Sequence, residues 1–188
     1  MIAYLDNSAT TRPTEGVAGA MVQSMRDGYF NPSSLYAPAV EAEKAMRACR
    51  ELIARSVNAQ PDGVYFTSGG TEANNLAILG AIAARRGPIR AVVTASEHPS
   101  VLAVFDELRA GGHEVDVVPV DRAGQIDWAA LDGALEKGPA LVSAMQVNNE
   151  TGAVLDAPRL IERVRALAPE ALIHVDGVQG FLRLSFDA

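Results

Sequence analysis

The sequence predicts an α/β domain with a mostly parallel sheet and helices on both faces. In the part of the chain after residue 60, short apolar and β-branched runs alternate with segments of helical periodicity. Two of these runs, 91–93 and 171–175, are almost continuously apolar, which is typical of strands buried on both faces. The 188 residues, 48% of them hydrophobic and 21% charged, are enough for one domain with a substantial core.

The first third of the chain predicts an arm followed by two helices. Residues 1–14 are polar and rich in threonine, so we expect an N-terminal arm, with the large domain spanning 15–188. Apolar spacing predicts one helix from Thr14, as its cap, to about residue 26, and another over 38–57. Cys49 lies among apolar residues of the second helix, so we expect a buried core residue rather than a nucleophile.

The remaining elements follow the alternation. Glycine, proline and asparagine mark the turns between them. We expect strands near 63–67, 90–95, 114–119, 140–146 and 171–176, and helices near 71–86, 99–110, 127–136 and 158–168.

Polar clusters follow several of the predicted strands. They are Ser68-Gly69-Gly70-Thr71, Glu97-His98-Pro99, Asn148-Asn149-Glu150, and Asp176 with Gln179. Each cluster on its own could be a helix cap or a turn. Because ligands of open α/β sheets bind beyond the carboxyl ends of the strands, the clusters together indicate a binding site.

The residue types in these clusters suit pyridoxal phosphate. A glycine-rich turn at a helix start can bind a phosphate, and Thr71 can add a hydroxyl. An imidazole such as His98 can stack on the flat ring, and amides can meet the ring hydroxyl. Asp176 can pair with the pyridinium nitrogen, which would keep the ring an electron sink.

Composition excludes several other classes of function. A formal net charge of -7 and a pI near 4.9 argue against general nucleic-acid binding. Apolar runs are too short to span a bilayer and the N-terminus has no signal pattern, so we expect no membrane partner and a cytoplasmic protein. The single cysteine excludes an intramolecular disulfide and a cysteine-rich metal site, and we expect no metal.

Six motifs, in order along the chain, resemble those of the NifS/IscS-type cysteine desulfurases. These are class V aminotransferases with the type I pyridoxal-phosphate fold. The motifs are Tyr4-Leu5-Asp6-Asn7-Ser8-Ala9-Thr10-Thr11, Asn31-Pro32-Ser33-Ser34, 66–75 (FTSGGTEANN), Glu97-His98-Pro99-Ser100-Val101, Val147-Asn148-Asn149-Glu150-Thr151-Gly152 and His174-Val175-Asp176-Gly177-Val178-Gln179.

The resemblance implies a role for each candidate residue. Gly70 and Thr71 would bind the phosphate, and His98 would stack on the ring and transfer protons. The other three would lie nearer the ring substituents: Asn149 at the ring hydroxyl and the substrate, Asp176 at the pyridine nitrogen, and Gln179 at the ring hydroxyl.

The resemblance also implies a reaction and partners. The family converts L-cysteine to L-alanine and passes a persulfide sulfur to an acceptor or to an iron–sulfur scaffold protein, and it forms homodimers. Some positions depart from the family pattern: Tyr36 replaces the usual histidine, Ala39 a glycine, and Gly177 and Gly180 frequent alanines. We expect a differently shaped loop at 31–39 but no lost cofactor contact.

The Schiff-base lysine of the family is absent. The chain has two lysines, Lys44 and Lys137, and both are predicted to be solvated. We therefore expect the N-terminal portion of a desulfurase, truncated before that lysine and before the mobile-loop cysteine, which is inactive alone and binds the cofactor weakly or not at all. The alternatives are another class V enzyme, such as a selenocysteine lyase or a cysteine sulfinate desulfurase, and a non-catalytic interaction subunit that keeps the fold.

Overall fold

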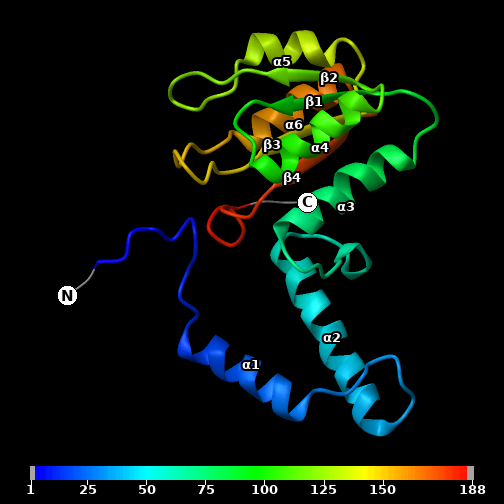
Figure 1. Cartoon of the computed structure of the whole chain (residues 1–188), viewed down its shortest axis with the longest axis vertical. Helices are drawn as coiled ribbons and strands as arrows, with labels where there is room; N and C mark the ends of the chain where they lie inside the picture. Colours follow the sequence, from blue (N-terminus) through cyan, green and yellow to red (C-terminus); the bar gives the residue numbers. More distant parts are fainter. Residues whose placement is uncertain (1–2, 186–188) are drawn as a thin grey trace. The chain divides into compact units, whose positions relative to one another are not determined.

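The computed structural model describes residues 3–185 (Figure 1). Packing divides them into two compact units, one of residues 3–66 with 184–185, and one of residues 67–183. The sequence predicts a boundary after residue 14, between an N-terminal arm and the large domain. This division into compact units does not test that boundary, which stays a prediction.

The first unit contains the two expected helices, α1 (Glu15–Asp27) and α2 (Ala37–Ser56). The Thr14 hydroxyl accepts a hydrogen bond from the amide of Val17 at 3.3 Å, which confirms the predicted cap. A single 3₁₀ turn, η1 (Pro61–Gly63), follows α2.

Two expectations for this unit are wrong. Residues 63–67 form no strand, because an extended segment becomes a strand only when a neighbour pairs with it, and Val64 is extended without one. Cys49 is exposed rather than buried, and within α2 only Ala39 and Ala54 are buried. Helical periodicity predicts which residues share a face, but it does not show that another element covers that face.

The second unit is a parallel sheet of four strands in the order β2-β1-β3-β4. The strands are β1 (Arg90–Thr94), β2 (Glu114–Val118), β3 (Leu141–Met145) and β4 (Leu172–Asp176). The connecting helices are α3 (Gly70–Ala83), α4 (Pro99–Ala110), α5 (Trp128–Leu135) and α6 (Ala157–Leu167). These elements confirm the predicted α/β alternation, and the four sheet strands lie where the sequence predicts them.

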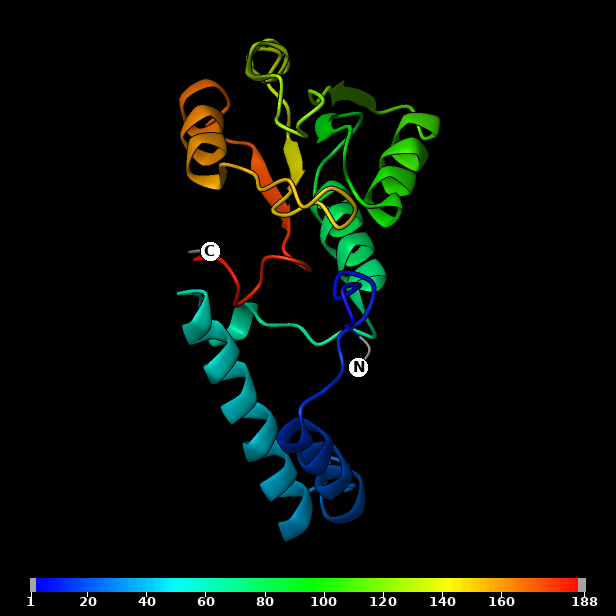
Figure 2. The ribbon, with the colours of Figure 1, turned by 90° about the vertical axis from the view of Figure 1, so that its left-hand side faces the viewer.

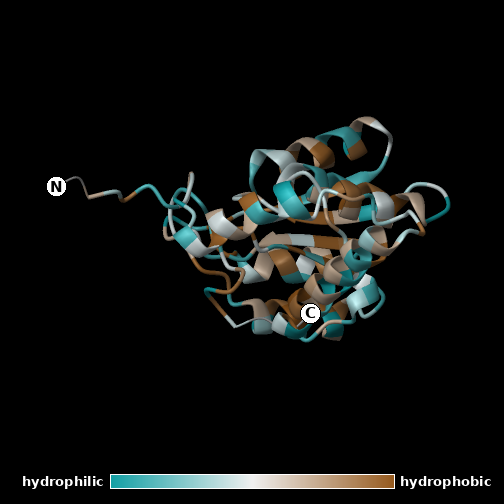
Figure 3. Cartoon of the chain, turned by 90° about the horizontal axis from the view of Figure 1, so that it is seen from below, coloured by the Kyte–Doolittle hydropathy of each residue, from teal (hydrophilic) through white to brown (hydrophobic). Residues whose placement is uncertain are grey.

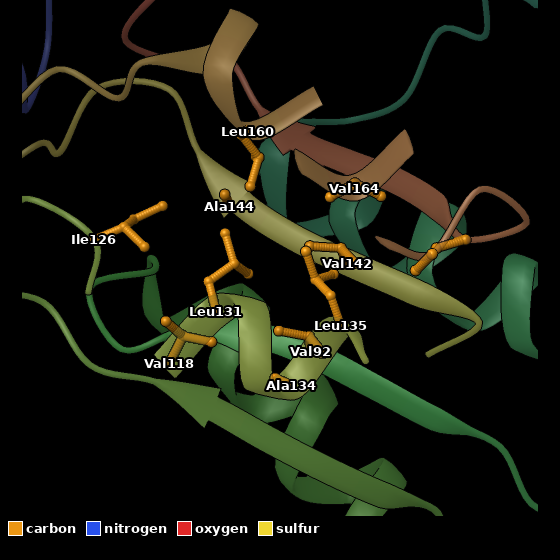
Figure 4. Close-up of a cluster of buried hydrophobic side chains, with 12 residues drawn as sticks. Val92, Val118, Ile126, Leu131, Ala134, Leu135, Val142, Ala144, Leu160 and Val164 are labelled. Atoms are coloured by element: carbon orange, nitrogen blue, oxygen red, sulfur yellow. The ribbon is translucent and has the colours of Figure 1, made fainter. Parts of the chain in front are cut away.

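Both faces of the sheet are covered. Successive residues of β1 point to opposite faces: Val92 packs in one core cluster, and Ala91 and Val93 pack in the other. Figure 2 shows α4 and α6 on opposite sides of the strands, and in Figure 3 strand segments are strongly apolar. Figure 4 shows the cluster in which Leu131 of α5 and Leu160 of α6 meet β1 and β3.

Candidate cofactor site

The strand order creates a switch point at the carboxyl ends of β1 and β3. From β1 the chain crosses to β2 on one side and later returns to β3 on the other side of β1. Open α/β sheets bind ligands at such a point. The loops after β1, β3 and β4 carry His98, Asn149 and Gln179, so the sheet places these candidates at one edge.

Asp176, the last residue of β4, is buried at this edge. It is 6% exposed and lies opposite Met145 in the parallel register. Its Oδ2 accepts a hydrogen bond from Asn74 Nδ2 at 2.9 Å, and its Oδ1 accepts one from the amide of Val178 at 3.0 Å. A buried carboxylate is costly unless donors meet it, and here one donor faces each oxygen.

Asn74 connects Asp176 with His98. The Asn74 amide nitrogen also donates to Ser100 Oγ at 3.0 Å, and Ser100 Oγ lies 2.8 Å from Nδ1 of His98. The Ser100 amide donates to the same ring nitrogen at 3.1 Å, so His98 caps α4 as well as facing the site. With Nδ1 as an acceptor, the proton of the neutral ring is on Nε2.

The start of α3 is a glycine-rich turn of the kind that can bind an anion. Gly69 is the N-cap of this 14-residue helix, and Gly70 and Thr71 open its first turn, where amide groups lack carbonyl partners within the helix. The Glu72 carboxylate accepts hydrogen bonds from the amide and hydroxyl of Ser68, at 2.6 and 2.7 Å. These bonds lower the pKa of Glu72 and fix the turn.

This turn follows an unpaired extended segment, not the predicted strand, so tertiary contacts position it. A Cβ atom added to Gly70 would lie 3.2 Å from Cγ2 of Val178, in the turn after β4. Together with the bond from Asn74 to Asp176, this close approach joins the start of α3 to the end of β4.

Asn149 and Gln179 reach the same edge through their loops. The side chain of Asn148 organises the loop of Asn149: its oxygen accepts from the amides of Glu150 and Thr151, and its nitrogen donates to the Ser96 carbonyl at 2.9 Å. That last bond ties the loop after β3 to the loop after β1. Gln179 lies in the turn after β4, where it accepts a hydrogen bond from Arg183 at 3.3 Å.

Sequence reasoning missed Asn74, Ser100 and the buried Glu97 as functional candidates, although all three lie inside the quoted motifs. Asn74 follows Gly70 by four residues, so helical spacing places both on one face and could have indicated it. The importance of Ser100 and Glu97 depends on contacts between distant segments, for which the sequence gives no local signal.

Within residues 3–185, no group of three or more histidine, cysteine, aspartate or glutamate side chains is placed to hold a metal ion. In the same part of the chain, every helix is too short or too polar to cross a bilayer.

A parallel sheet with a glycine-rich helix start, a histidine and a buried aspartate at its carboxyl edge is an arrangement suited to a phosphorylated ring cofactor. The class-V aminotransferase family model matches residues 3–188, and the chain belongs to this family.

Comparison with individual proteins shows which members of this family the chain is similar to. The chain is 38% identical over 178 residues to cysteine desulfurase 2 of Trichormus variabilis, a match that covers 95% of this chain and 44% of that protein. A solved NifS-like protein matches with a TM-score of 0.89 and 31% identity, over 93% of this chain and 48% of that one. A structure described as SspA in complex with cysteine matches with a TM-score of 0.88 and 31% identity, over 98% of this chain and 53% of that one.

These comparisons confirm the predicted family and fold class. The chain spans about half the length of the relatives it matches, and the match corresponds to their N-terminal portion.

Proposed function

We propose that this chain forms the cofactor-facing part of a pyridoxal-phosphate-dependent cysteine desulfurase. The observation that carries the proposal is the buried Asp176, held by Asn74 and Val178 beside the start of α3. The names of the relatives support the activity, and the cysteine complex of the similar SspA structure supports L-cysteine as the substrate.

The residues present fit the cofactor. A side chain at Gly70 would meet Val178 in a tight contact of 3.2 Å, so glycine suits the helix start, where Gly70 and Thr71 would hold the phosphate. His98, with its ring orientation fixed by Ser100, would lie against the ring and move a proton at Nε2. Asp176 would bind the ring nitrogen, and when bound the cofactor supplies the electron sink for the reaction.

Two further residues would complete the cofactor contacts. Asn149 would orient the substrate and meet the ring hydroxyl, and Gln179 would meet the same hydroxyl. Both side chains are partly accessible at the carboxyl edge of the sheet, which supports these roles.

The covalent attachment of the cofactor needs a lysine that this chain does not offer at the site. Lys44 is 61% exposed and pairs with Glu41 at 2.8 Å. Lys137 pairs with Asp116 at 2.7 Å. We therefore place the attaching lysine and the sulfur-accepting cysteine outside these 188 residues. From the resemblance to the NifS/IscS-type desulfurases, we also propose a cytoplasmic homodimer that passes sulfur to an acceptor or iron–sulfur scaffold protein.

A titration with pyridoxal phosphate tests the cofactor site. Because attachment is absent, binding should be weak, so we would follow backbone amide shifts by NMR up to millimolar cofactor. Shifts should concentrate at Gly70, Thr71, His98 and the residues after Asp176. Pyridoxal without the phosphate should produce smaller shifts at the start of α3, since the phosphate contacts are missing.

The matched variants are Asp176→Asn and, as a control, Asp106→Asn on the exposed side of α4. The first should weaken binding and the second should not. The proposed function would be contradicted by amide shifts spread over the whole surface, or by shifts in Asp176→Asn as large as those in the wild type.

A further inference from the structure

Glu97 is a buried acid without a role in the proposed function. It directly precedes His98 and is 5% exposed. Its Oε1 accepts a hydrogen bond from the hydroxyl of Thr94 at 2.7 Å. Its Oε2 is the one buried side-chain nitrogen or oxygen among residues 3–185 that has no hydrogen-bond partner. Native proteins rarely leave such an atom unpaired without a reason.

The surroundings of Glu97 disfavour its charged form. Burial raises the pKa of Glu97 to about 7, and the negative charge of Asp176 contributes in the same direction. The Thr94 hydroxyl, which bonds to Oε1, opposes this rise in pKa, and so does the nearby backbone of Met145. The neighbouring strands therefore present one charged group to Glu97, Asp176 of β4, while β1 and β3 present neutral donors.

Two acids buried at the same edge of the sheet cannot both be ionised without a large cost in free energy. Asp176 has a donor on each oxygen, whereas Glu97 has an orphan oxygen. A neutral Glu97 places no second negative charge beside the ring-binding carboxylate, and it keeps the loop that carries His98 anchored to β1.

We propose that Glu97 is a positioning residue of the cofactor site, and that a cation bound at Asp176 favours its charged form over the neutral acid. The role of Asp176 as receiver of a cationic ring nitrogen rests on the proposed function. A cation there offsets the charge that repels ionised Glu97, so ligand binding makes Glu97 easier to ionise and releases part of a proton near neutral pH.

The first test is a pH titration of the ligand-free 188-residue chain. The ¹³C shift of the Glu97 carboxyl carbon, assigned by comparison with Glu97→Gln, should have its midpoint near 7. Asp176→Asn should lower the midpoint, because it removes the repelling charge. Thr94→Val should raise it, because it removes a bond to the charged form. A midpoint in the ordinary glutamate range, or one that ignores both variants, would overturn the proposal.

Stability provides a second readout that needs no assignment. A raised pKa means that the folded chain binds more protons than the unfolded chain between pH 4.5 and about 7. The wild type should therefore lose unfolding free energy relative to Glu97→Gln as the pH rises through this window, and the difference should level off above it. A difference that stays constant with pH would contradict a neutral buried Glu97.

The same titration in the presence of pyridoxal phosphate separates the proposal for Glu97 from the proposed function. Amide shifts report whether pyridoxal phosphate binds, and the Glu97 carbon reports its ionisation in the same samples. Bound cofactor should lower the Glu97 midpoint, and an unchanged midpoint with bound cofactor would overturn the coupling. If no cofactor binds while the midpoint stays near 7, the coupling fails for this chain, but the neutral acid near Asp176 stands; the proposed function is judged separately, by the amide shifts of Asp176→Asn and Asp106→Asn.

Discussion

At the scale of single residues, the candidate site depends on side chains that hold other side chains in position. Asn74 donates both to Asp176 and to Ser100, and Ser100 in turn fixes the ring of His98. The two residues that would contact the cofactor ring are thus oriented by one buried amide, 6% exposed. Buried polar networks of this kind are stabilising only when each member keeps its partner.

Asn74→Leu should therefore destabilise the second unit. The variant keeps the size of the side chain but leaves Asp176 without one of its donors, which costs about 1.5–3 kcal/mol for a buried bond to a charged group. Urea unfolding at pH 7 measures this loss. Asn75→Leu is the control, because Asn75 is less buried and bonds only locally, to the carbonyl of Thr71. Equal losses from both variants would contradict a special role for Asn74.

The two glycines that replace frequent family alanines should respond differently to restoration of the alanine. A Cβ atom at Gly177 would lie 3.7 Å from Oε1 of Gln146, an ordinary contact, but one at Gly180 would lie 2.0 Å from the same atom. Gln146 is 4% exposed and has little room to move. We expect Gly177→Ala to be neutral and Gly180→Ala to lose about 1–3 kcal/mol, as overpacked variants do.

A thermal unfolding series checks this pair of variants. Gln146→Ala introduced into the Gly180→Ala chain should recover part of the loss, because it removes the colliding atoms. A stable Gly180→Ala chain would mean that Gln146 does not pack against the turn after β4 as described.

At the scale of elements, the start of α3 shows how a helix terminus is fixed in place while its first-turn amides stay unbonded. Glu72 bonds back to Ser68, which satisfies groups before the helix and leaves the amides of the first turn available. Asn74, one turn later, ties the helix to β4. The turn is thus fixed from both sides without hydrogen bonds to the amides that would hold the phosphate in the proposed function.

Glu72→Gln should lower the melting temperature, and the effect should depend on pH. The lowered pKa of Glu72 means that its charged form stabilises the fold above the usual glutamate value of 4.5. This contribution is lost as the pH falls below that value, so wild type and variant should converge in acid. Scanning calorimetry between pH 3 and pH 7 measures the difference. Glu107→Gln, on the exposed side of α4, is the control, and a pH-independent difference for Glu72→Gln would contradict the assignment.

At the scale of the whole molecule, the two units differ in how well they bury apolar residues. Both core clusters lie in residues 67–183, whereas α1 has no buried residue. Val17, Met21, Val22 and Met25 of α1 are all at least half exposed. The unit that carries the candidate site therefore has a core of its own, and the first unit has little.

The positions of the lysines predict that the chain alone neither attaches the cofactor nor produces L-alanine from L-cysteine. Lys137 pairs with Asp116, which also bonds Arg90 at the first residue of β1, so this network lies away from the carboxyl ends of the strands. Borohydride reduction with equimolar pyridoxal phosphate, followed by peptide mass spectrometry, should find no more adduct on Lys44 or Lys137 than in the unfolded chain. A stoichiometric adduct on one lysine of the folded chain would contradict this.

Local signals in the sequence determined much of this fold. Apolar runs and turn residues located the four sheet strands and the helices between them, since periodicity and capping depend on neighbouring residues. Residue types at the strand ends indicated a binding site at one edge of the sheet, and the structure places the loops that carry these residues at that edge. The same signals failed at 63–67 and at Cys49, because pairing and burial require partners that are distant in sequence.

Only the tertiary structure decided how the site is supported. The strand order placed the loops after β1 and β3 side by side, and the contact between α3 and β4 gave Asp176 its donor. Nothing in the sequence distinguishes Glu97 from other glutamates, because its raised pKa results from burial and from the charge of Asp176. Periodicity is a property of neighbours along the chain, whereas hydrogen bonding, burial and electrostatic coupling are properties of residues that the fold brings together.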